Sequence, residues 1–515
     1  MKGIDLYSGI GGWTLGMKFS GLENIYSYEW NKDSLETHNL NFKTKLDVVD
    51  IRKLKLDQIP NPEEIDFVVG SPPCTQFSYS NRGGSGNISD GLVDVFKFLE
   101  IVNYIKPRYW VMENVPRVKK IIDHVINNDK NFKKFKPLIK FNEVVNVSEF
   151  GVPQKRKRMI CGDFPYELFL SYKGLVKKKS LGDVLNSLDN TPIKDPNYDI
   201  SFDNVLDHIK ETPLSKTELR INNNNKTSHH IYNKMSFPDV THLPSRTITS
   251  TCTRVSRESI IIEENGNYRR LTLREKGCLQ GFPINFQFYG NTFSSKEKMI
   301  GNSIPPVLTY LIFESIKGTP IKKLKLTDEL TINNFKGPIE KPKNTPPPIP
   351  KNNYNENRRF RFSIPNLRLG SGVRFELNNM FKTNRWGISF FYGNSKSIFE
   401  LVLNEEVKIF LEKILNENLE NYFITDTSLL KLKSKNLQEK WIDGEESFYP
   451  FEIIDKIGNL VVSVLDTIEN NHFDRERLYP LFNEKINKKI IDNFNVVLCG
   501  LIIGSTINFH IDNEG

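Results

Sequence analysis

The sequence predicts an α/β fold for its first two thirds: a doubly wound sheet covered by helices, with a smaller loop-rich domain, and then a separate α+β domain. Three observations lead to this prediction. Apolar runs of strand length alternate with amphipathic segments over residues 1–160. The chain has 515 residues, which is too long for one compact core. A stretch rich in proline and asparagine, at 341–359, separates the last third as a linker.

Strands and helices alternate in the first region. The candidate strands are Lys2–Tyr7, Ile25–Glu29, Phe67–Val69, Tyr109–Met112 and Met159–Gly162. An amphipathic segment at Leu92–Ile105 predicts a helix between two of them. This alternation is typical of a mainly parallel sheet with both faces covered. Two more helices are expected later, at Thr272–Leu279 and Pro305–Ile316.

Periodicity weakens in the middle of the chain, where the charged run Lys177–Lys179 and the polar run Asn222–Asn225 interrupt it. The chain therefore divides into predicted domains by the strength of its pattern. The pattern is strong over residues 1–162 and again over 269–320, whereas 163–268 are loop-rich; a linker of 338–359 and a C-terminal domain of 360–515 follow.

Charge, cysteine content and hydropathy limit the function classes. The formal net charge is +9, and residues 338–515 hold 23 Lys and Arg against 24 Asp and Glu, so the excess lies in the first two thirds. That excess favours a polyanionic partner, although ordinary solvated lysines explain it equally well. Five cysteines without paired spacing predict neither a disulfide framework nor a metal site. The same cysteine usage predicts a reducing, intracellular location. No apolar run approaches the roughly 20 residues of a membrane span.

A glycine-rich turn follows the first candidate strand, in DLYSGIGG at residues 5–12. Such a turn lets backbone N–H groups approach a ligand closely. Glu29 ends the second strand, where a carboxylate accepts hydrogen bonds from a ribose diol, and Asp50 is placed to accept from an adenine amino group. Singly, each carboxylate is better explained as a solvated strand end or a helix cap. Together with the turn they indicate an adenosine-containing cofactor, and the lack of G-x-G-x-x-G disfavours a dinucleotide.

A second set of chemical groups lies at the ends of three other strands. Cys74 comes after two prolines in SPPCTQFS, at the carboxyl edge of a strand, and is a candidate nucleophile. The alternative for a lone cysteine is a small apolar residue in a turn. Residues 79–91 are glycine-rich and predict a loop that closes over a substrate. Glu113 ends another strand, and Arg156 and Arg158 share one face if their segment is extended.

These segments together resemble the DNA cytosine-5 methyltransferases that use S-adenosylmethionine. Six blocks stand in the family's order across residues 1–317, and the resemblance ends at the linker. The blocks are DLYSGIGG, SPPCTQFS, ENV, QKRKR, RRLTLREKGCLQGFP (269–283) and GNSIPP (301–306). The resemblance implies a catalytic methyltransferase domain of residues 1–162 with 269–320, built on a Rossmann-like doubly wound mixed sheet, and a target-recognition domain of residues 163–268.

The resemblance also implies the catalytic roles. Cys74 matches the nucleophile that adds to cytosine C6, and Glu113 matches the residue that protonates ring N3. Arg158 matches the arginine that contacts cytosine O2, while Arg156 helps to hold the thiolate and the charge of the pocket. The target atom cannot be reached inside a duplex, so the cytosine must be flipped out into this pocket.

S-adenosylmethionine is the cofactor that the resemblance implies. Tyr7 stands where the family usually has Phe, and its ring can still face an adenine. The positions that match cofactor-binding residues are Tyr7, Ser8, Gly9, Ile10, Gly11, Glu29, Trp30, Asp50, Ile51, Pro72 and Asn302.

The partner implied is double-stranded DNA. The segment 244–249 resembles the short conserved part of the recognition domain, and the candidate DNA contacts are Thr247, Thr249, Arg254 and Arg257. For each of them taken singly, a surface residue without DNA contact is the simpler alternative. A monomer is expected, with a cognate restriction endonuclease as a possible partner.

The C-terminal domain carries the weakest signals. Strand-like runs at Trp386–Phe391 and Val496–Ile503 and a helical one at Glu405–Leu419 indicate an α+β unit. Its scattered acids permit a nuclease, but no strand-borne acid pair with a following lysine stands out. A fused endonuclease and a binding or interaction module therefore both stay open.

We therefore expect a sequence-specific DNA (cytosine-5-)-methyltransferase of restriction-modification. One alternative is methylation of tRNA, which the long middle region and the tail disfavour. Another is a DNA-binding protein that has lost turnover, which the presence of Cys74, Glu113 and Arg158 disfavours.

Overall fold

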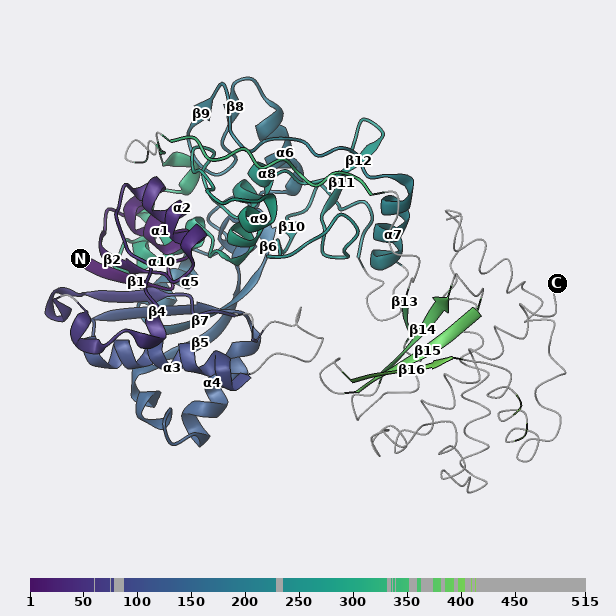
Figure 1. Cartoon of the computed structure of the whole chain (residues 1–515). Coiled ribbons are helices and arrows are strands. Elements are labelled where there is room, and N and C mark those ends of the chain that lie inside the picture. The colour runs from purple at the N-terminus through teal and green to yellow at the C-terminus, as the bar shows by residue number, and fades with distance from the viewer. Residues whose placement is uncertain are drawn as a thin grey trace. The chain divides into compact units, whose positions relative to one another are not determined.

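A computed structural model gives the structure of the chain (Figure 1). It describes residues 1–351 apart from 60, 75, 78–87, 228–234, 331–334, 336 and 339, and beyond them the backbone of four strands and two helical residues, 409 and 413. The chain forms two compact units, which are considered separately. Unit 1 holds residues 1–82, 86–214 and 237–350, and unit 2 holds 83–85, 215–236 and 351–515.

Unit 1 is built on a six-stranded mixed sheet with the order β2-β1-β3-β4-β7-β5 (Figure 1). Its strands are β1 (Lys2–Leu6), β2 (Glu23–Tyr28), β3 (Phe67–Gly70), β4 (Tyr109–Asn114), β5 (Phe141–Asn146) and β7 (Lys157–Asp163). The first four strands in the sheet order are parallel, whereas β7 runs antiparallel to both β4 and β5. The predicted α/β fold class is therefore confirmed, and β5 is a strand that the sequence pattern did not reveal.

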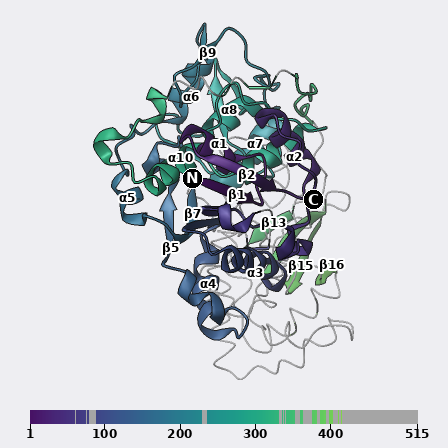
Figure 2. The same ribbon diagram turned by 90° about the vertical axis from the view of Figure 1, so that its left-hand side faces the viewer.

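Helices cover both faces of this sheet (Figures 1 and 2). Alternate residues of a strand point to opposite faces, and in β3 Phe67 and Val69 join one apolar cluster while Val68 joins another. The first cluster includes residues of α1 (Gly12–Phe19) and α10 (Pro306–Ile316), and the second includes residues of α3 (Ile88–Ile105) and α4 (Arg117–Asn128). The sheet is thus buried on both sides, as doubly wound folds require.

The predicted helices near the end of unit 1 are present. The helix α8 (Leu273–Leu279) begins after Thr272, which forms a capping box with Glu275. The Thr272 Oγ1 accepts from the Glu275 backbone N–H at 3.1 Å, and the Glu275 carboxylate accepts from the Thr272 N–H at 2.7 Å. The other helices of unit 1 are α2 (Lys32–Phe42), α5 (Tyr166–Ser171), α6 (Leu181–Asp189) and α9 (Phe293–Asn302).

The middle region contains short strands joined by loops, and one of them, β10 (Ser245–Arg246), pairs with β6 (Gln154–Lys155) of the preceding domain. The others are β8 (Ile193–Lys194), β9 (Ser201–Phe202), β11 (Ile261–Glu264) and β12 (Asn267–Arg270). A further apolar cluster joins residues of α6 and Ile248 to Cys278 and Leu279 of α8. The predicted recognition domain and the predicted catalytic domain thus share a core, which fixes the segment after β10 to the sheet-bearing part of unit 1.

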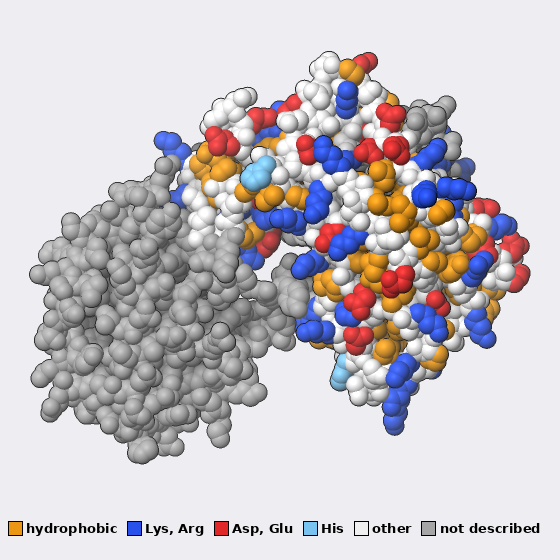
Figure 3. Space-filling model, turned by 180° about the vertical axis from the view of Figure 1, so that it is seen from behind, with side chains coloured by type: hydrophobic (Ala, Val, Ile, Leu, Met, Phe, Trp, Pro, Cys, Tyr) orange, Lys and Arg blue, Asp and Glu red, His pale blue; other side chains and the backbone are white. Residues whose placement is uncertain are grey.

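Short 3₁₀ helices occupy several connections of unit 1. They are η1 (Ile51–Lys53), η2 (Leu56–Gln58), η3 (Pro62–Glu64), η5 (Lys133–Leu138), η6 (Val147–Phe150), η7 (Ile321–Lys323) and η8 (Thr327–Glu329). Residues 340–351, within the predicted linker, form neither helix nor strand. Lys and Arg side chains on the face seen in Figure 3 are interspersed with acidic and apolar ones.

Unit 2 includes α7 (Lys216–Thr227) and an antiparallel sheet with the order β13-β14-β15-β16. Its strands are β13 (Arg359–Phe362), β14 (Arg374–Met380), β15 (Arg385–Tyr392) and β16 (Ser397–Val402). The predicted strand at Trp386–Phe391 lies within β15. The predicted strand Val496–Ile503 and, apart from two residues, the predicted helix Glu405–Leu419 lie outside the described residues. Within the described residues, no helix combines the length and apolar character that a membrane span requires.

Candidate active site

The candidate nucleophile lies at the carboxyl edge of the parallel part of the sheet. Leu6 at the end of β1 pairs with Gly70 of β3, and Gly70 pairs with Met112 of β4, so the segments after these strands lie side by side. Cys74 follows β3 and is partly exposed. The Asn114 side-chain amide donates to the Pro72 carbonyl oxygen at 3.0 Å in a buried hydrogen bond. This bond holds the backbone before Cys74 against the end of β4.

Glu113 and Arg158 form an ion pair beside this segment. The antiparallel pairing of β4 with β7 brings them together, and the Arg158 Nε lies 2.8 Å from the Glu113 Oε1. Both side chains are nearly buried, at 6% and 11% exposed. A charge-assisted hydrogen bond between two buried side chains is stronger than an ion pair at the surface, because water screens it less. Arg158 also donates to the Lys157 carbonyl oxygen at 2.7 Å, which fixes the direction of its guanidinium.

The surroundings of Cys74 set the charge of its thiol. Burial raises the pKa of Cys74 above its ordinary value because the thiolate loses solvation, and the negative charge of Glu113 raises it further. The positive charges of Arg158 and Arg156 act in the opposite direction. In the protein alone the thiol form therefore predominates at neutral pH, and the two arginines are the groups that favour ionisation.

Alkylation of Cys74 tests this balance. We expect iodoacetamide to modify Cys74 slowly at neutral pH and faster as the pH rises above about 9, because the reactive thiolate forms only above the raised pKa. Mass spectrometry of the Cys74 peptide measures the rate over a pH series, with a free-cysteine peptide as the control. A Cys74 that reacts with a midpoint below that of the peptide would contradict the raised pKa.

Arg156 is fully buried and bonded to the backbone. Its guanidinium donates to the carbonyl oxygens of Ile248 at 3.0 Å, Gly301 at 2.8 Å and Ser303 at 3.2 Å. The residue predicted to hold the pocket charge thus also ties the segment after β10 to the end of α9. A Cβ at Gly301 would lie 2.5 Å from the backbone of Thr249, so this junction needs glycine.

The glycine turn after β1 is braced by Glu29. Its carboxylate accepts from the backbone N–H groups of Gly9 at 2.8 Å, Trp30 at 3.0 Å and Asn31 at 2.7 Å. Burial raises the pKa of Glu29, and the three N–H groups partly offset that rise. The carboxylate thus orders the turn that the sequence predicted to approach a ligand.

Several features of this turn fit an adenosine-containing cofactor. The Ser8 Oγ is buried and has no hydrogen-bond partner among the residues that the structure describes. A Cβ built on Gly9 would meet open space. The side chain of Trp30, which follows Glu29 in the sequence, is 57% exposed. A ligand would supply both the missing partner and the missing contacts.

The remaining predicted cofactor positions lie on three segments. Asp50 caps η1 by accepting from the Arg52 N–H at 3.2 Å, and Ile51 is buried in the apolar cluster of α3. A Cβ at Gly12 would lie 2.3 Å from the Ile304 carbonyl oxygen, so the turn after Asn302 reaches the start of α1. The structure therefore brings the segment of Asn302 next to the glycine turn.

The predicted DNA contacts differ in their exposure. Thr247 and Thr249 lie on the segment after β10, and their hydroxyls donate to the carbonyl oxygens of Lys155 at 2.8 Å and Thr251 at 3.2 Å. The Arg257 side chain is 28% exposed and pairs with Glu258. Arg254 is buried at 3% exposed and forms a 2.8 Å ion pair with Glu211. Its charge is therefore neutralised inside the protein, where its guanidinium also donates to the carbonyl oxygens of Thr212 and Pro213, both at 3.0 Å.

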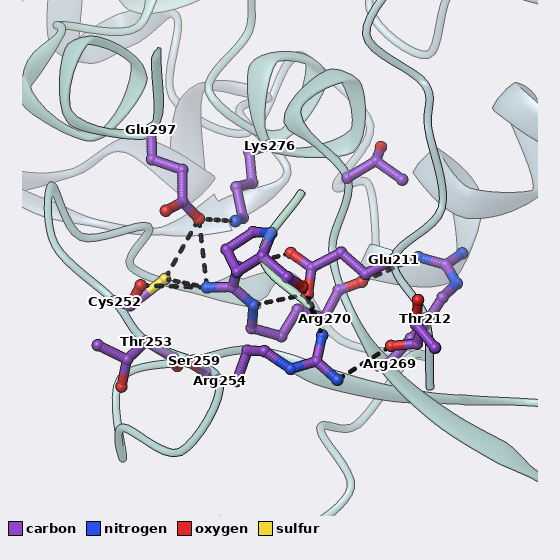
Figure 4. A network of polar contacts seen from close by, with 12 residues as sticks. Glu211, Thr212, Cys252, Thr253, Arg254, Ser259, Arg269, Arg270, Lys276 and Glu297 are labelled. Carbon is purple, nitrogen blue, oxygen red and sulfur yellow. Dashed lines mark hydrogen bonds and ion pairs between the residues drawn. The ribbon is translucent and has the colours of Figure 1, made fainter. Parts of the chain in front are cut away.

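A buried ionic network surrounds Arg254 (Figure 4). Glu211 also accepts from Arg270 at 2.6 Å, and Arg270 reaches Glu297 of α9 at 3.4 Å. Lys276 of α8 bonds to the same Glu297 carboxylate. Removing one partner from such a network leaves a buried charge uncompensated, which costs about 3–5 kcal/mol. Sequence reasoning missed these roles, although Arg270 lies in the block RRLTLREK, where two adjacent arginines before a capping box were a usable signal.

Comparisons with known proteins identify the family of this chain. The family model described as C-5 cytosine-specific DNA methylase matches residues 1–318. The chain is 29% identical over 343 residues to the type II methyltransferase M.FnuDI of Fusobacterium nucleatum, covering 64% of this chain and 98% of that protein. It is 28% identical over 348 residues to the type II methyltransferase M.NgoPII of Neisseria gonorrhoeae, covering 62% and 96%.

Among solved structures, that of the Entamoeba histolytica methyltransferase EhMeth matches with a TM-score of 0.45 and 18% identity, covering 62% of this chain and 98% of that one. The family model spans more than half of the present chain, and all six blocks of the sequence lie within it. The protein therefore belongs to the C-5 cytosine-specific DNA methylase family and is a DNA (cytosine-5-)-methyltransferase.

Proposed function

We propose that the protein methylates C5 of a cytosine that is flipped out of double-stranded DNA, through a covalent bond between the Cys74 Sγ and cytosine C6. The observation that supports this most is the grouping of Cys74 with the Glu113–Arg158 ion pair at one edge of the sheet. These are the nucleophile, the acid and the cation that the reaction needs.

The chemistry of cytosine assigns a task to each side chain. The ring is a poor electrophile at C6, so the Cys74 thiolate adds there only when the ring gains a proton or a strong hydrogen bond at N3. Glu113 in its carboxylic acid form donates its proton to N3, and Arg158 holds Glu113 while its remaining N–H groups contact cytosine O2. Addition at C6 makes C5 nucleophilic. After methylation a base takes the C5 proton, the C5=C6 double bond forms again, and the Cys74 Sγ leaves as a thiolate.

S-adenosylmethionine is the proposed methyl donor, and when bound it supplies an electrophilic methyl group. Glu29 and Asp50 would hold its adenosine, with the exposed Trp30 ring as a stacking surface. The full set of proposed cofactor residues is Tyr7, Ser8, Gly9, Ile10, Gly11, Glu29, Trp30, Asp50, Ile51, Pro72 and Asn302. Thr247, Thr249 and Arg257 are proposed to contact DNA, with Arg254 positioning their segment.

The biological setting that we propose is restriction-modification. The two relatives described above, from Fusobacterium nucleatum and Neisseria gonorrhoeae, both bear the name type II methyltransferase. A methyltransferase in this setting protects host DNA from an endonuclease that reads the same sequence, which would be the cognate partner of this chain.

Covalent trapping tests the proposed substrate. Duplex DNA with 5-fluorocytosine lacks the C5 proton, so the enzyme cannot leave after methylation and stays attached. With S-adenosylmethionine we expect an adduct that maps to Cys74 on such DNA and none on a matched 5-fluorocytosine RNA. An adduct on RNA alone would replace DNA by RNA as the substrate, and no adduct on either, with DNA bound, would indicate a binding protein without turnover.

A further inference from the structure

Arg52 lies directly after two proposed cofactor residues, Asp50 and Ile51, and its side chain forms hydrogen bonds with the first turns of α3. Its Nε and Nη2 donate to the two carboxylate oxygens of Asp94 at 2.9 and 2.7 Å. Its Nη1 donates to the Asp90 Oδ1 at 2.8 Å, and the Nη2 also reaches the Asp90 carbonyl oxygen at 3.1 Å. One guanidinium therefore binds both acidic side chains, in a fork that only arginine provides.

The charges explain why this contact matters for α3. Asp90 and Asp94 are four residues apart on the helix, so they lie on the same face and their like charges repel. The Asp94 side chain is 5% exposed, and a carboxylate so buried needs a positive partner. The hydrogen bond from Arg52 is also the main cause that lowers the pKa of Asp90. Without Arg52, the buried Asp94 carboxylate would lose the ion pair that offsets the cost of its burial.

The contacts continue toward the cofactor turn on one side. The Tyr7 hydroxyl lies 3.3 Å from both the Asp94 Oδ1 and the Asp94 carbonyl oxygen. Tyr7 itself has a φ of 57°, in the left-handed region, and is followed by the turn that Glu29 braces. Asp94 is thus held from two proposed cofactor segments, through Tyr7 after β1 and through Arg52 after Asp50.

On the other side the contacts reach the nucleophile. The Gln76 amide donates to the Asp90 Oδ2 at 3.3 Å, and Gln76 is two residues after Cys74. The Phe77 N–H donates to the Cys74 carbonyl oxygen at 2.9 Å, and the Phe77 ring is fully buried. A Cβ at Gly91 would lie 2.5 Å from that ring, so the turn from Cys74 to Phe77 rests directly on the start of α3.

We propose that Arg52 is a positioning residue that couples the cofactor site to the nucleophile. This inference rests on the proposed function. Adenosine that binds against Tyr7, Asp50 and Ile51 makes the contacts of the Arg52 side chain more rigid. The start of α3 then holds the turn of Cys74 in the orientation that attacks cytosine. Arg52 touches neither cofactor nor base in this scheme and acts through Asp90, Asp94 and Gln76.

The test compares Arg52→Met with the matched control Lys55→Met, which removes a positive charge from an exposed side chain of the same segment. Three quantities are measured on the full chain: the cofactor Kd by calorimetry, the alkylation rate of Cys74 with and without S-adenosylmethionine, and the rate of trapping on 5-fluorocytosine DNA. In the unmodified protein and in the control, we expect the cofactor to change the alkylation rate several-fold.

In Arg52→Met we expect that response to disappear and trapping to slow about 100-fold, because misplacement of a reacting group by about 1 Å costs that much. Arg52→Lys restores the charge without the fork and should recover only part of the response. Asp90→Asn keeps the ion pair between Arg52 and the buried Asp94. It should therefore weaken the effect of the cofactor on the alkylation rate less than Arg52→Met does, and it replaces Arg52→Met as the test if Arg52→Met does not fold.

A response to cofactor that persists in Arg52→Met would overturn the coupling, as would an unmodified protein whose Cys74 alkylation ignores the cofactor. Failure of the proposed function has a different signature. In that case the unmodified protein forms no adduct on DNA, while the alkylation comparison still decides whether Arg52 couples the two segments.

Discussion

Replacing Cys74 by serine is expected to lower methylation by at least about 1,000-fold, because the reaction loses its nucleophile. A serine hydroxyl has nearly the size of the thiol but ionises far less readily, so it does not add to cytosine C6. Methyl transfer from tritiated S-adenosylmethionine to DNA measures the loss. The 5-fluorocytosine adduct should disappear in the same variant.

The fold and the cofactor site provide the controls for this variant. Cys74 lies in a turn after β3 and is partly exposed, so the serine variant should unfold at nearly the same temperature. Its affinity for S-adenosylmethionine should also stay close to that of the unmodified protein, because the proposed cofactor contacts come from other residues. Methylation that continues at the normal rate would rule out Cys74 as the nucleophile.

Replacing Glu113 by glutamine is expected to lower methylation by about 100- to 10,000-fold, the range typical of a lost general acid. Glutamine keeps the shape of the side chain but supplies neither the proton for N3 nor the charge that orients Arg158, now 2.8 Å away. The measurement is again methyl transfer to DNA, made with saturating cofactor so that the loss reports on kcat.

The same variant should make Cys74 more reactive toward alkylation. The charge of Glu113 raises the pKa of Cys74, so its removal lowers that pKa and more thiolate is present at neutral pH. Glu143→Gln is the matched control, since Glu143 is a half-exposed acid of β5 that pairs with Lys119. If Glu113→Gln lowered both methylation and alkylation, general disruption of the site would explain the loss better than a missing acid.

Local pattern predicted most of the elements of unit 1. The five candidate strands correspond to β1, β2, β3, β4 and β7, and the capping residue Thr272 marked the start of α8. The strand β5 was missed because its sequence, FNEVVN, is half polar. It lies at the edge of the sheet, where several of its side chains face solvent, so its burial pattern lacks the apolar run of a central strand.

The candidate site, too, could be predicted from local sequence only in part. The sequence located Cys74, Glu113 and Arg158 at the ends of separate strands, and register then brought them together, as in the antiparallel pairing of β4 with β7. Arg254 was predicted to contact DNA, with a surface cation as the alternative, yet it is buried against Glu211, which lies 43 residues away. No local pattern reveals such a partner.

The order and spacing of residues along the chain determined this protein's family and fold class and predicted its reactive groups. Only the tertiary structure decided which charges pair, because ion pairs such as Arg52 with Asp94 and Arg270 with Glu297 join segments that are distant in the chain. The physical reason is that burial makes an unpaired charge costly, and burial is a property of the packed molecule.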